Sequence, residues 1–181
     1  MINEKKYFHL SDKGFFIIKG VDKIKFLQGL TSNDLNKVKS KKIIYSSILT
    51  PQGKILFDIF ISQRGQDFLV ECSRKNLSEL TEKLEMYKLN SKVSIEIEQN
   101  LKSFLINQSH IENLLGRSKD EDLFYCEDPR FEKKLLKIYC VNKIFKEIKQ
   151  ELSLTSLTNE EYENIKLQNT ILDCDIESIK S

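Results

Sequence analysis

Three apolar segments separated by short turns constrain the fold of this chain most strongly. Residues 43–49, 54–62 and 67–72 are rich in Ile, Leu, Phe and Val, and the turn sequences 50–53 and 63–66 separate them. Short apolar segments bounded by Pro, Gly and Gln-rich turns are typical of strands. Because consecutive strands joined by short turns pair in an antiparallel manner, the sequence predicts a three-stranded meander over residues 43–72.

The segments on either side of this meander predict a mixed fold. An amphipathic helix is indicated from Asp22, with that residue as its N-cap, and a longer one follows Ser73 as cap. Further strands are expected at 7–10, 14–20, 93–98, 101–107, 123–131 and 134–142. Residues 143–169 have a mostly helical but polar pattern. This order of strands and helices predicts an α+β protein.

Asp58 interrupts the second strand of the meander. Side chains alternate between the faces of a strand, so this carboxylate lies on the face opposite to Phe57 and Ile59. Burying a carboxylate without a partner costs several kcal/mol, in rough terms. Two interpretations remain open: Asp58 faces solvent or pairs with Lys54, or it accepts hydrogen bonds from the N–H groups of a bound heterocycle.

Composition narrows the function classes. The 181 residues include 29 basic and 27 acidic ones, a balance that does not favour binding to nucleic acid through electrostatics. The chain lacks an apolar run of roughly 18 to 20 residues, so no membrane partner is expected. The N-terminal residues lack an apolar signal-peptide core, which predicts a cytoplasmic protein.

The cysteines do not predict a metal site. Cys72, Cys126, Cys140 and Cys174 are widely spaced and form no Cys-x-x-Cys pair, whereas zinc sites usually have ligands at short spacing. Cys72 and Cys140 lie in apolar, strand-like runs, which indicates that they are small buried hydrophobic residues.

Four stretches carry a resemblance to a known family. FLQGLTSND at 26–34, YSSILTPQGKILFD at 45–58, MYKLNSKV at 86–93 and DPR at 128–130 together resemble the folate-binding YgfZ family. That family is related to the glycine-cleavage aminomethyltransferase, or T-protein. Its further signatures, a Lys-Gly-Cys-Tyr-x-Gly-Gln-Glu loop and a C-terminal β-barrel, have no counterpart in this sequence. We therefore expect no chemistry that depends on them.

The resemblance implies a fold and its division. It implies two small ferredoxin-like α/β-sandwich units with antiparallel sheets around a central cleft, so that the whole of 1–181 forms a folate-binding region. The two interleaved subdomains are expected at roughly 1–45 with 128–181, and at 46–127.

The resemblance also implies site residues for tetrahydrofolate or a derivative. Asp58 matches the second aspartate of a transferase strand associated with the folate site, and Phe57 stands in place of the first. The other candidates are Gln28 and Asn33 beside the cavity, Tyr45 against the pterin, Gln52 and Lys54 near the glutamate tail, and Glu71 on the neighbouring strand. A structural interpretation stays open for several of them: Asn33 and its neighbour Asp34 as helix caps, Lys54 as a solvated residue and Tyr45 as a core residue.

Three functions remain under consideration. The first is an auxiliary, non-enzymatic binder of reduced folate that supports assembly or repair of iron–sulfur proteins and indirectly affects tRNA modification. The second is a folate-dependent aminomethyltransferase, which the Phe57 replacement disfavours. The third is an interaction module without a ligand, in which an exposed apolar surface favours a dimer.

Overall fold

The chain forms two compact units in a computed structural model that describes residues 2–38, 42–50, 52–110, 112, 114, 123–131 and 135–171. Among these residues, the first unit consists of 2–11 and 100–171, and the second consists of 12–99. The second unit is thus inserted between two parts of the first. These boundaries differ from the expected 1–45 with 128–181 and 46–127, because the strand formed by residues 13–19 pairs with strands from 67–73 and 94–98.

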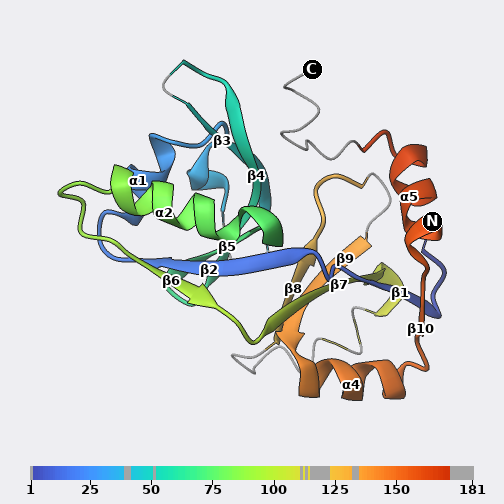
Figure 1. Cartoon of the computed structure of the whole chain (residues 1–181). Coiled ribbons are helices and arrows are strands. Elements are labelled where there is room, and N and C mark those ends of the chain that lie inside the picture. Colours follow the sequence, from blue (N-terminus) through green and yellow to red (C-terminus); the bar gives the residue numbers. More distant parts are fainter. Residues whose placement is uncertain are drawn as a thin grey trace. The chain divides into compact units, whose positions relative to one another are not determined.

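The inserted unit is built on a five-stranded antiparallel sheet (Figure 1). Its strands lie in the order β3-β4-β5-β2-β6. The bounds are β2 Lys13–Lys19, β3 Ile44–Leu49, β4 Ile55–Arg64, β5 Asp67–Ser73 and β6 Ser94–Glu98. The predicted meander is confirmed, because β3, β4 and β5 are consecutive neighbours in the sheet.

Two helices and two short 3₁₀ turns accompany this sheet. They are α1 Lys23–Gln28, η1 Leu35–Lys37, η2 Arg74–Asn76 and α2 Leu77–Tyr87. Asp22 occupies the N-cap position of α1, as predicted, and Ser73 occupies that of η2, but neither makes a side-chain capping hydrogen bond. Asp22 Oδ2 instead accepts a hydrogen bond of 2.8 Å from the backbone N–H of Lys92, which joins α1 to the segment before β6.

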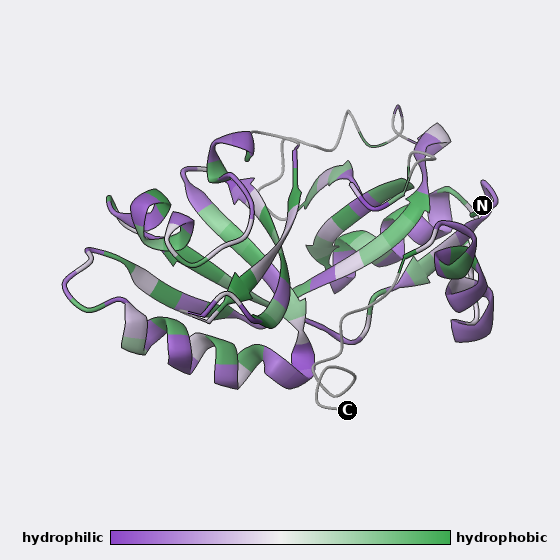
Figure 2. Ribbon diagram, turned by 90° about the horizontal axis from the view of Figure 1, so that it is seen from above, coloured by the Kyte–Doolittle hydropathy of each residue, from purple (hydrophilic) through white to green (hydrophobic). Residues whose placement is uncertain are grey.

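The core of the inserted unit lies between one face of the sheet and its helices. Apolar side chains from strands and helices form one buried cluster, with Phe16, Leu27, Phe57, Leu80 and Leu84 among its members. In Figure 2 the strands are largely hydrophobic, whereas the helices alternate between hydrophobic and hydrophilic residues. The amphipathic pattern of α2 therefore has its expected cause, the burial of one helix face.

The other unit contains a second five-stranded sheet, in the order β10-β1-β7-β9-β8. The bounds are β1 Lys6–His9, β7 Leu101–Asn107, β8 Leu123–Glu127, β9 Leu135–Val141 and β10 Thr155–Ser156. Only the short β1–β10 pair is parallel among the described strands. The unit also has η3 Gln108–His110, α4 Asn142–Glu151 and α5 Asn159–Gln168. The predicted α+β class with antiparallel sheets is confirmed.

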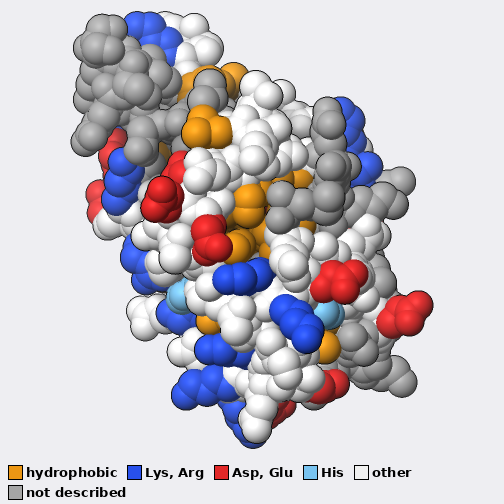
Figure 3. Space-filling model, turned by 90° about the vertical axis from the view of Figure 1, so that its right-hand side faces the viewer, with side chains coloured by type: hydrophobic (Ala, Val, Ile, Leu, Met, Phe, Trp, Pro, Cys, Tyr) orange, Lys and Arg blue, Asp and Glu red, His pale blue; other side chains and the backbone are white. Residues whose placement is uncertain are grey.

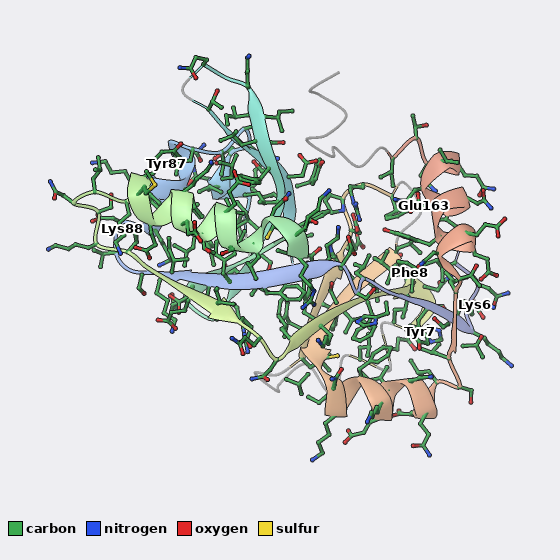
Figure 4. The ribbon with its side chains drawn as sticks, viewed as in Figure 1. Lys6, Tyr7, Phe8, Tyr87, Lys88 and Glu163 are labelled. Carbon is green, nitrogen blue, oxygen red and sulfur yellow. The ribbon has the colours of Figure 1, made fainter. Side chains whose placement is uncertain are left out.

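Each face of this second sheet has its own apolar cluster. Phe104 and Ile138 belong to the cluster that contains Phe145 of α4, whereas Phe8 and Leu105 belong to the one that contains Tyr162 of α5. Phe8 stacks on Tyr162 with ring centroids 3.8 Å apart. Figure 4 shows Phe8 and its neighbour Tyr7 on β1, next to α5.

The surface and the cysteines agree with the composition. On the face drawn in Figure 3, basic and acidic side chains are interspersed. Within the described residues, no helix has the length and apolar character needed to cross a membrane. Cys72 and Cys140 are buried in strands, which confirms that they serve as small core residues, and Cys174 lies outside the described residues.

Candidate functional site

One row of side chains crosses all five strands of the inserted unit's sheet. Tyr45 of β3 is opposite Phe60 of β4, which is opposite Glu71 of β5. The row continues through Phe15 of β2 to Glu98 of β6. These side chains lie on the sheet face opposite to α2, because Phe57, Ile59 and the other residues that alternate with them belong to the core beneath the helices.

Asp58 lies on this same face, two residues before Phe60 along β4. It is half-buried, and its cross-strand neighbour is Ser47 of β3. Ser47 Oγ donates a hydrogen bond of 2.9 Å to Asp58 Oδ1, so the carboxylate is held in one orientation. The suggested partner Lys54 instead lies exposed at the hairpin and forms no ion pair within the described part of the chain. The sheet thus supplies a polar partner for one carboxylate oxygen.

Glu71 and Tyr45 share the face of Asp58. Glu71 is opposite Phe60, two residues along β4 from Asp58, and its side chain is only 1% exposed. Tyr45 is half-buried, and its ring lies 5.1 Å from that of Phe60, tilted by 47°. The structure therefore brings three predicted site residues onto one face: two carboxylates and an aromatic ring.

Gln28 and Asn33 hold the loop between α1 and β3. Gln28 accepts a hydrogen bond of 2.8 Å from the backbone N–H of Leu35 and donates one of 3.1 Å to the carbonyl of Asn33. The Asn33 amide donates to the carbonyl of Tyr45 at 2.9 Å. Their side chains are thus engaged within the protein. The helix cap is Asp34, which accepts a hydrogen bond of 2.9 Å from the N–H of Asn36.

Gln52 and Lys54 belong to the β3–β4 hairpin. Their backbone N–H groups both donate to Thr50 Oγ1, at 3.2 and 3.1 Å, and both residues are exposed. Gly53 has φ +81°, the left-handed conformation that this tight turn requires. The hairpin is therefore ordered by Thr50, and the lysine side chain extends from its surface.

Sequence reasoning missed a serine network that links the loop at 32–33 to Ser46 and Ser47 of β3. Ser32 Oγ lies 3.3 Å from Ser46 Oγ and accepts a hydrogen bond of 2.9 Å from the N–H of Ser47. Ser46 Oγ also accepts from the N–H of Asn33, at 3.1 Å. The signal was present in the sequence, because two adjacent serines interrupt an otherwise apolar strand at 43–49. Their role depends on cross-strand register, which the sequence does not specify.

Phe57 occupies a different environment from Asp58. It is 1% exposed and belongs to the core beneath the helices, on the opposite face of the sheet. An aspartate at this position would lie on that opposite face as well. The Phe57 replacement therefore removes no charged group from the face that carries Asp58, and it is weaker evidence against transfer chemistry than the sequence alone suggested.

The described residues also bear on metal binding. Among them, no group of three or more His, Cys, Asp or Glu side chains is arranged to hold a metal ion. Burial raises the pKa of the Cys72 thiol to about 12, with a further contribution from the negative charge of Glu71. Cys72 directly follows Glu71 in β5, but its side chain belongs to the core on the opposite face of the sheet.

Comparisons with known proteins find relatives of two kinds. No family model matches the chain. The chain is 32% identical over 93 residues to an iron–sulfur cluster assembly factor, the mitochondrial IBA57 homolog of Pyricularia oryzae, covering 49% of this chain and 23% of the relative. It is 28% identical over 137 residues to an aminomethyltransferase of Caldanaerobacter subterraneus, covering 70% of this chain and 36% of the relative.

The fold of this chain matches that of a solved structure. Aminomethyltransferase T of the glycine cleavage system from Bartonella henselae matches 84% of this chain with a TM-score of 0.70 and 13% identity. The match covers 47% of that chain, and the sequence matches span about a quarter to a third of the curated relatives.

One prediction is corrected by these comparisons. The cytoplasmic location is contradicted, because the IBA57 relatives from Pyricularia oryzae, Mycosarcoma maydis, Neurospora crassa and Mus musculus are mitochondrial proteins. The prediction relied on the lack of an apolar signal-peptide core, a feature that does not distinguish cytosol from mitochondrion. The predicted relationship is confirmed: the chain is related to IBA57-type assembly factors and aminomethyltransferases, and it has the fold of aminomethyltransferase T.

Proposed function

We propose that this chain binds a reduced folate on the sheet face that carries Asp58 and acts as an auxiliary factor in iron–sulfur protein assembly. The observation that carries the proposal is the fixed, half-buried carboxylate of Asp58 beside the Tyr45–Phe60 ring pair. The similarity to IBA57-type factors supports the cellular role, and the similarity to aminomethyltransferases supports the ligand class.

The chemistry of the face suits a pterin. A pterin presents an amino group beside a ring N–H, and a carboxylate can accept both hydrogen bonds. Ser47 occupies Oδ1 of Asp58 from one side, which fixes the plane of the carboxylate without consuming all of its acceptor capacity. Tyr45 supplies an aromatic surface of the kind that stacks on heterocycles. Glu71 adds a second carboxylate to this face.

In this proposal the iron–sulfur cluster belongs to a partner protein. Cys72, Cys126 and Cys140 are all buried in strands, and burial raises the pKa of the Cys140 thiol to about 12. Cluster ligation requires several thiolates that lie close together, and the described residues contain no group of three or more His, Cys, Asp or Glu side chains that could hold a metal ion. The described part of this chain therefore contributes folate binding and not cluster ligands. An indirect effect on tRNA modification would follow wherever the modifying enzyme contains such a cluster.

Isothermal titration calorimetry with tetrahydrofolate tests the ligand. Asp58→Asn keeps the size of the side chain and an acceptor for Ser47, but it removes the charge and one acceptor. A hydrogen bond to a charged group contributes about 1.5–3 kcal/mol, so we expect Asp58→Asn to weaken binding by roughly tenfold to a hundredfold. Ser47→Ala should have a smaller effect, because it removes only the group that orients the carboxylate.

A matched control separates this effect from a general loss of charge. Asp12→Asn changes an exposed carboxylate that pairs with Lys13, and it should leave folate affinity unchanged. Failure of the wild-type protein to bind tetrahydrofolate, or equal affinity of wild type and Asp58→Asn, would contradict the proposed site.

The cellular role is tested separately. In a strain that lacks this gene, the activity of iron–sulfur enzymes should fall relative to that of iron-free enzymes, and wild type but not Asp58→Asn should restore it. If iron–sulfur enzyme activities are unchanged in that strain, the proposed assembly role is wrong, whereas the proposal of folate binding is unaffected.

Aminomethyl transfer is the second candidate function. Phe57 is buried on the sheet face opposite to Asp58, so the aromatic residue at this position does not by itself exclude aminomethyl transfer. Turnover of tetrahydrofolate with an aminomethyl donor would establish it, whereas folate binding without turnover would support the auxiliary role alone.

A further inference from the structure

A second surface of the inserted unit has the features of a binding site, on the side of the sheet that carries the helices. A pocket of about 610 Å³ lies between the end of α1, the base of the β3–β4 hairpin and the end of α2. Its walls include Leu30, Leu49, Met86, Tyr87 and Leu89. Because Asp58 faces the other side of the sheet, this pocket is distinct from the proposed folate site.

Large apolar side chains are exposed around this pocket. Met86 is 72% exposed and Leu89 is 85% exposed, and Tyr87 between them is 36% exposed. Figure 4 shows Tyr87 at the end of α2. A contiguous group of exposed hydrophobic residues next to a pocket is characteristic of an interaction site, and methionine is common on adaptable binding surfaces.

The backbone at Leu89 is strained. Its φ is +44°, in the left-handed region, just after the C-cap residue of α2. Helices usually place Gly or Asn at such a position, since a side chain with a Cβ is disfavoured there. A leucine that is both strained and exposed contributes little to the stability of this unit. Contact with a partner would give this exposed side chain a function.

The hydrogen bonding of β3 restricts what that partner can be. The N–H of Leu49 donates to the carbonyl of Leu30 at 3.1 Å, and the N–H of Ser32 donates to the carbonyl of Ser47 at 3.0 Å. Residues 30–32 thus already occupy the edge of β3 beside the pocket. A partner strand cannot extend the sheet here, so the partner must satisfy its own backbone hydrogen bonds, as a helix does.

Two exposed lysines are near neighbours of residues that line the pocket. Lys54 follows the lining residue Gly53, and Lys25 lies one helical turn before Gly29. Both lysines are exposed and form no ion pair within the described residues. Lys88 is paired with Glu85 at 2.6 Å, so the acidic residue of this helix end is already neutralised. Two unneutralised lysines beside an apolar pocket complement an acidic ligand.

We propose that this pocket binds an acidic amphipathic helix of a partner protein, with Leu89, Met86 and Tyr87 contacting the apolar face of that helix. The apolar residues of the partner would recur at positions i, i+3 or i+4, and i+7, and acidic residues beside them would approach Lys25 and Lys54. This inference does not depend on folate binding.

Selection from a displayed library of 16-residue peptides tests the proposal on the full chain. We expect enrichment of peptides with that apolar spacing and with Asp or Glu at the intervening positions. Fluorescence anisotropy with a labelled, enriched peptide should show at least tenfold weaker binding to Leu89→Gly. Lys25→Glu combined with Lys54→Glu should weaken binding several-fold and reduce its dependence on salt.

The Leu89→Gly variant carries its own control for folding. Because glycine tolerates positive φ, this variant should melt at the same temperature as wild type or higher while losing the peptide. Leu167→Ala, which alters another exposed leucine (65% exposed) on α5 in the other unit, should bind the peptide as wild type does.

Four results would overturn the proposal. The first is that the selected peptides lack the helical apolar spacing, and the second is that Leu89→Gly binds the peptide as tightly as wild type does. The third is that the protein binds vesicles of phosphatidylglycerol and phosphatidylcholine, in a manner that depends on Leu89, and does not bind the peptide. The fourth is a Leu89-dependent dimer in sedimentation, which would identify a second copy of this chain as the occupant.

Discussion

At the scale of single residues, Asp58 shows how a sheet accommodates a carboxylate within an apolar strand. Its neighbours Phe57 and Ile59 enter the core, whereas Asp58 faces the other side and accepts a hydrogen bond from Ser47. The alternation was readable from the sequence. The serine partner was not, because it depends on which residue of β3 lies opposite.

Asp128 gives a prediction about pH. Arg130 donates from its backbone N–H, Nε and guanidinium nitrogen to this carboxylate, at 2.8–3.1 Å. Burial alone would raise the pKa of Asp128, but the hydrogen bonds and charge of Arg130, with the charge of Lys137, outweigh it and lower the pKa below 3.8. The ionised form therefore stabilises the fold above pH 3.8, and this contribution is lost as the pH falls through the folded-state pKa.

We expect Asp128→Asn to reduce the free energy of unfolding by about 3 kcal/mol at pH 7, because it removes the buried negative charge that pairs with Arg130. Urea unfolding of wild type and variant at pH 7 and pH 3 measures the difference. The difference in unfolding free energy should be smaller at pH 3, because the carboxyl group of the unfolded chain takes up a proton below pH 3.8, whereas the folded-state pKa is lower. A gap of equal size at both values would rule out the ion pair as its cause.

Gly20 gives a second prediction at this scale. Its φ is +113°, and an added Cβ would overlap the carbonyl oxygen of Lys92 and lie 2.9 Å from Val93 Cα. Gly20→Ala should therefore cost about 2 kcal/mol or more of unfolding free energy. Gly53→Ala is the matched control, since φ is +81° but no atom lies within 4 Å of its Cβ position. Its cost should be about 1 kcal/mol. Thermal melts of the two variants would contradict this account if they coincided.

At the scale of elements, the residue type at a helix start does not determine which side chain caps the helix. Asp22 and Ser73 have the right residue types for N-caps, yet neither caps through its side chain. The sequence Thr158-Asn159-Glu160-Glu161 contains a capping box that went unrecognised. Cap identity depends on where the backbone turns into the helix, and the residue type alone leaves several candidates.

The capping box of α5 gives a prediction for one element. Thr158 Oγ1 accepts a hydrogen bond of 3.1 Å from the N–H of Glu161, whose carboxylate accepts one of 2.7 Å from the N–H of Thr158. Thr158→Ala should destabilise the protein by about 1 kcal/mol, while Thr158→Ser should be nearly neutral. Amide hydrogen exchange in α5 measures this loss of stability. Unchanged protection of the first helical turn in the alanine variant would refute the role of the cap.

At the scale of the whole molecule, the described residues form one unit from 2–11 and 100–171 and a second from 12–99. Every residue of the inserted unit's core cluster, from Phe16 to Leu84, lies within that segment. The boundaries were not predictable from the sequence, because β2 directly follows β1 in the chain but belongs to the other sheet.

This arrangement predicts that residues 12–99 fold when expressed alone, because their sheet and core are complete within the segment. Circular dichroism should show β-rich structure and a cooperative thermal transition. Phe16→Ala, which removes a fully buried ring, should abolish the transition in the fragment and cost about 3–5 kcal/mol in the intact chain. A fragment with no cooperative transition would show that this unit depends on the other.

The sequence alone determined the α+β class, the meander, the burial of Cys72 and Cys140, and the face on which Asp58 lies, because strand alternation and helical periodicity are local properties. The family motifs likewise indicated the relationship that the comparisons confirm. Only the tertiary structure decided that Ser47 orients Asp58, that Glu71 and Tyr45 share its face, and that β2 joins β5 to β6. These features depend on strand order and register between distant segments, and many arrangements satisfy the same local pattern.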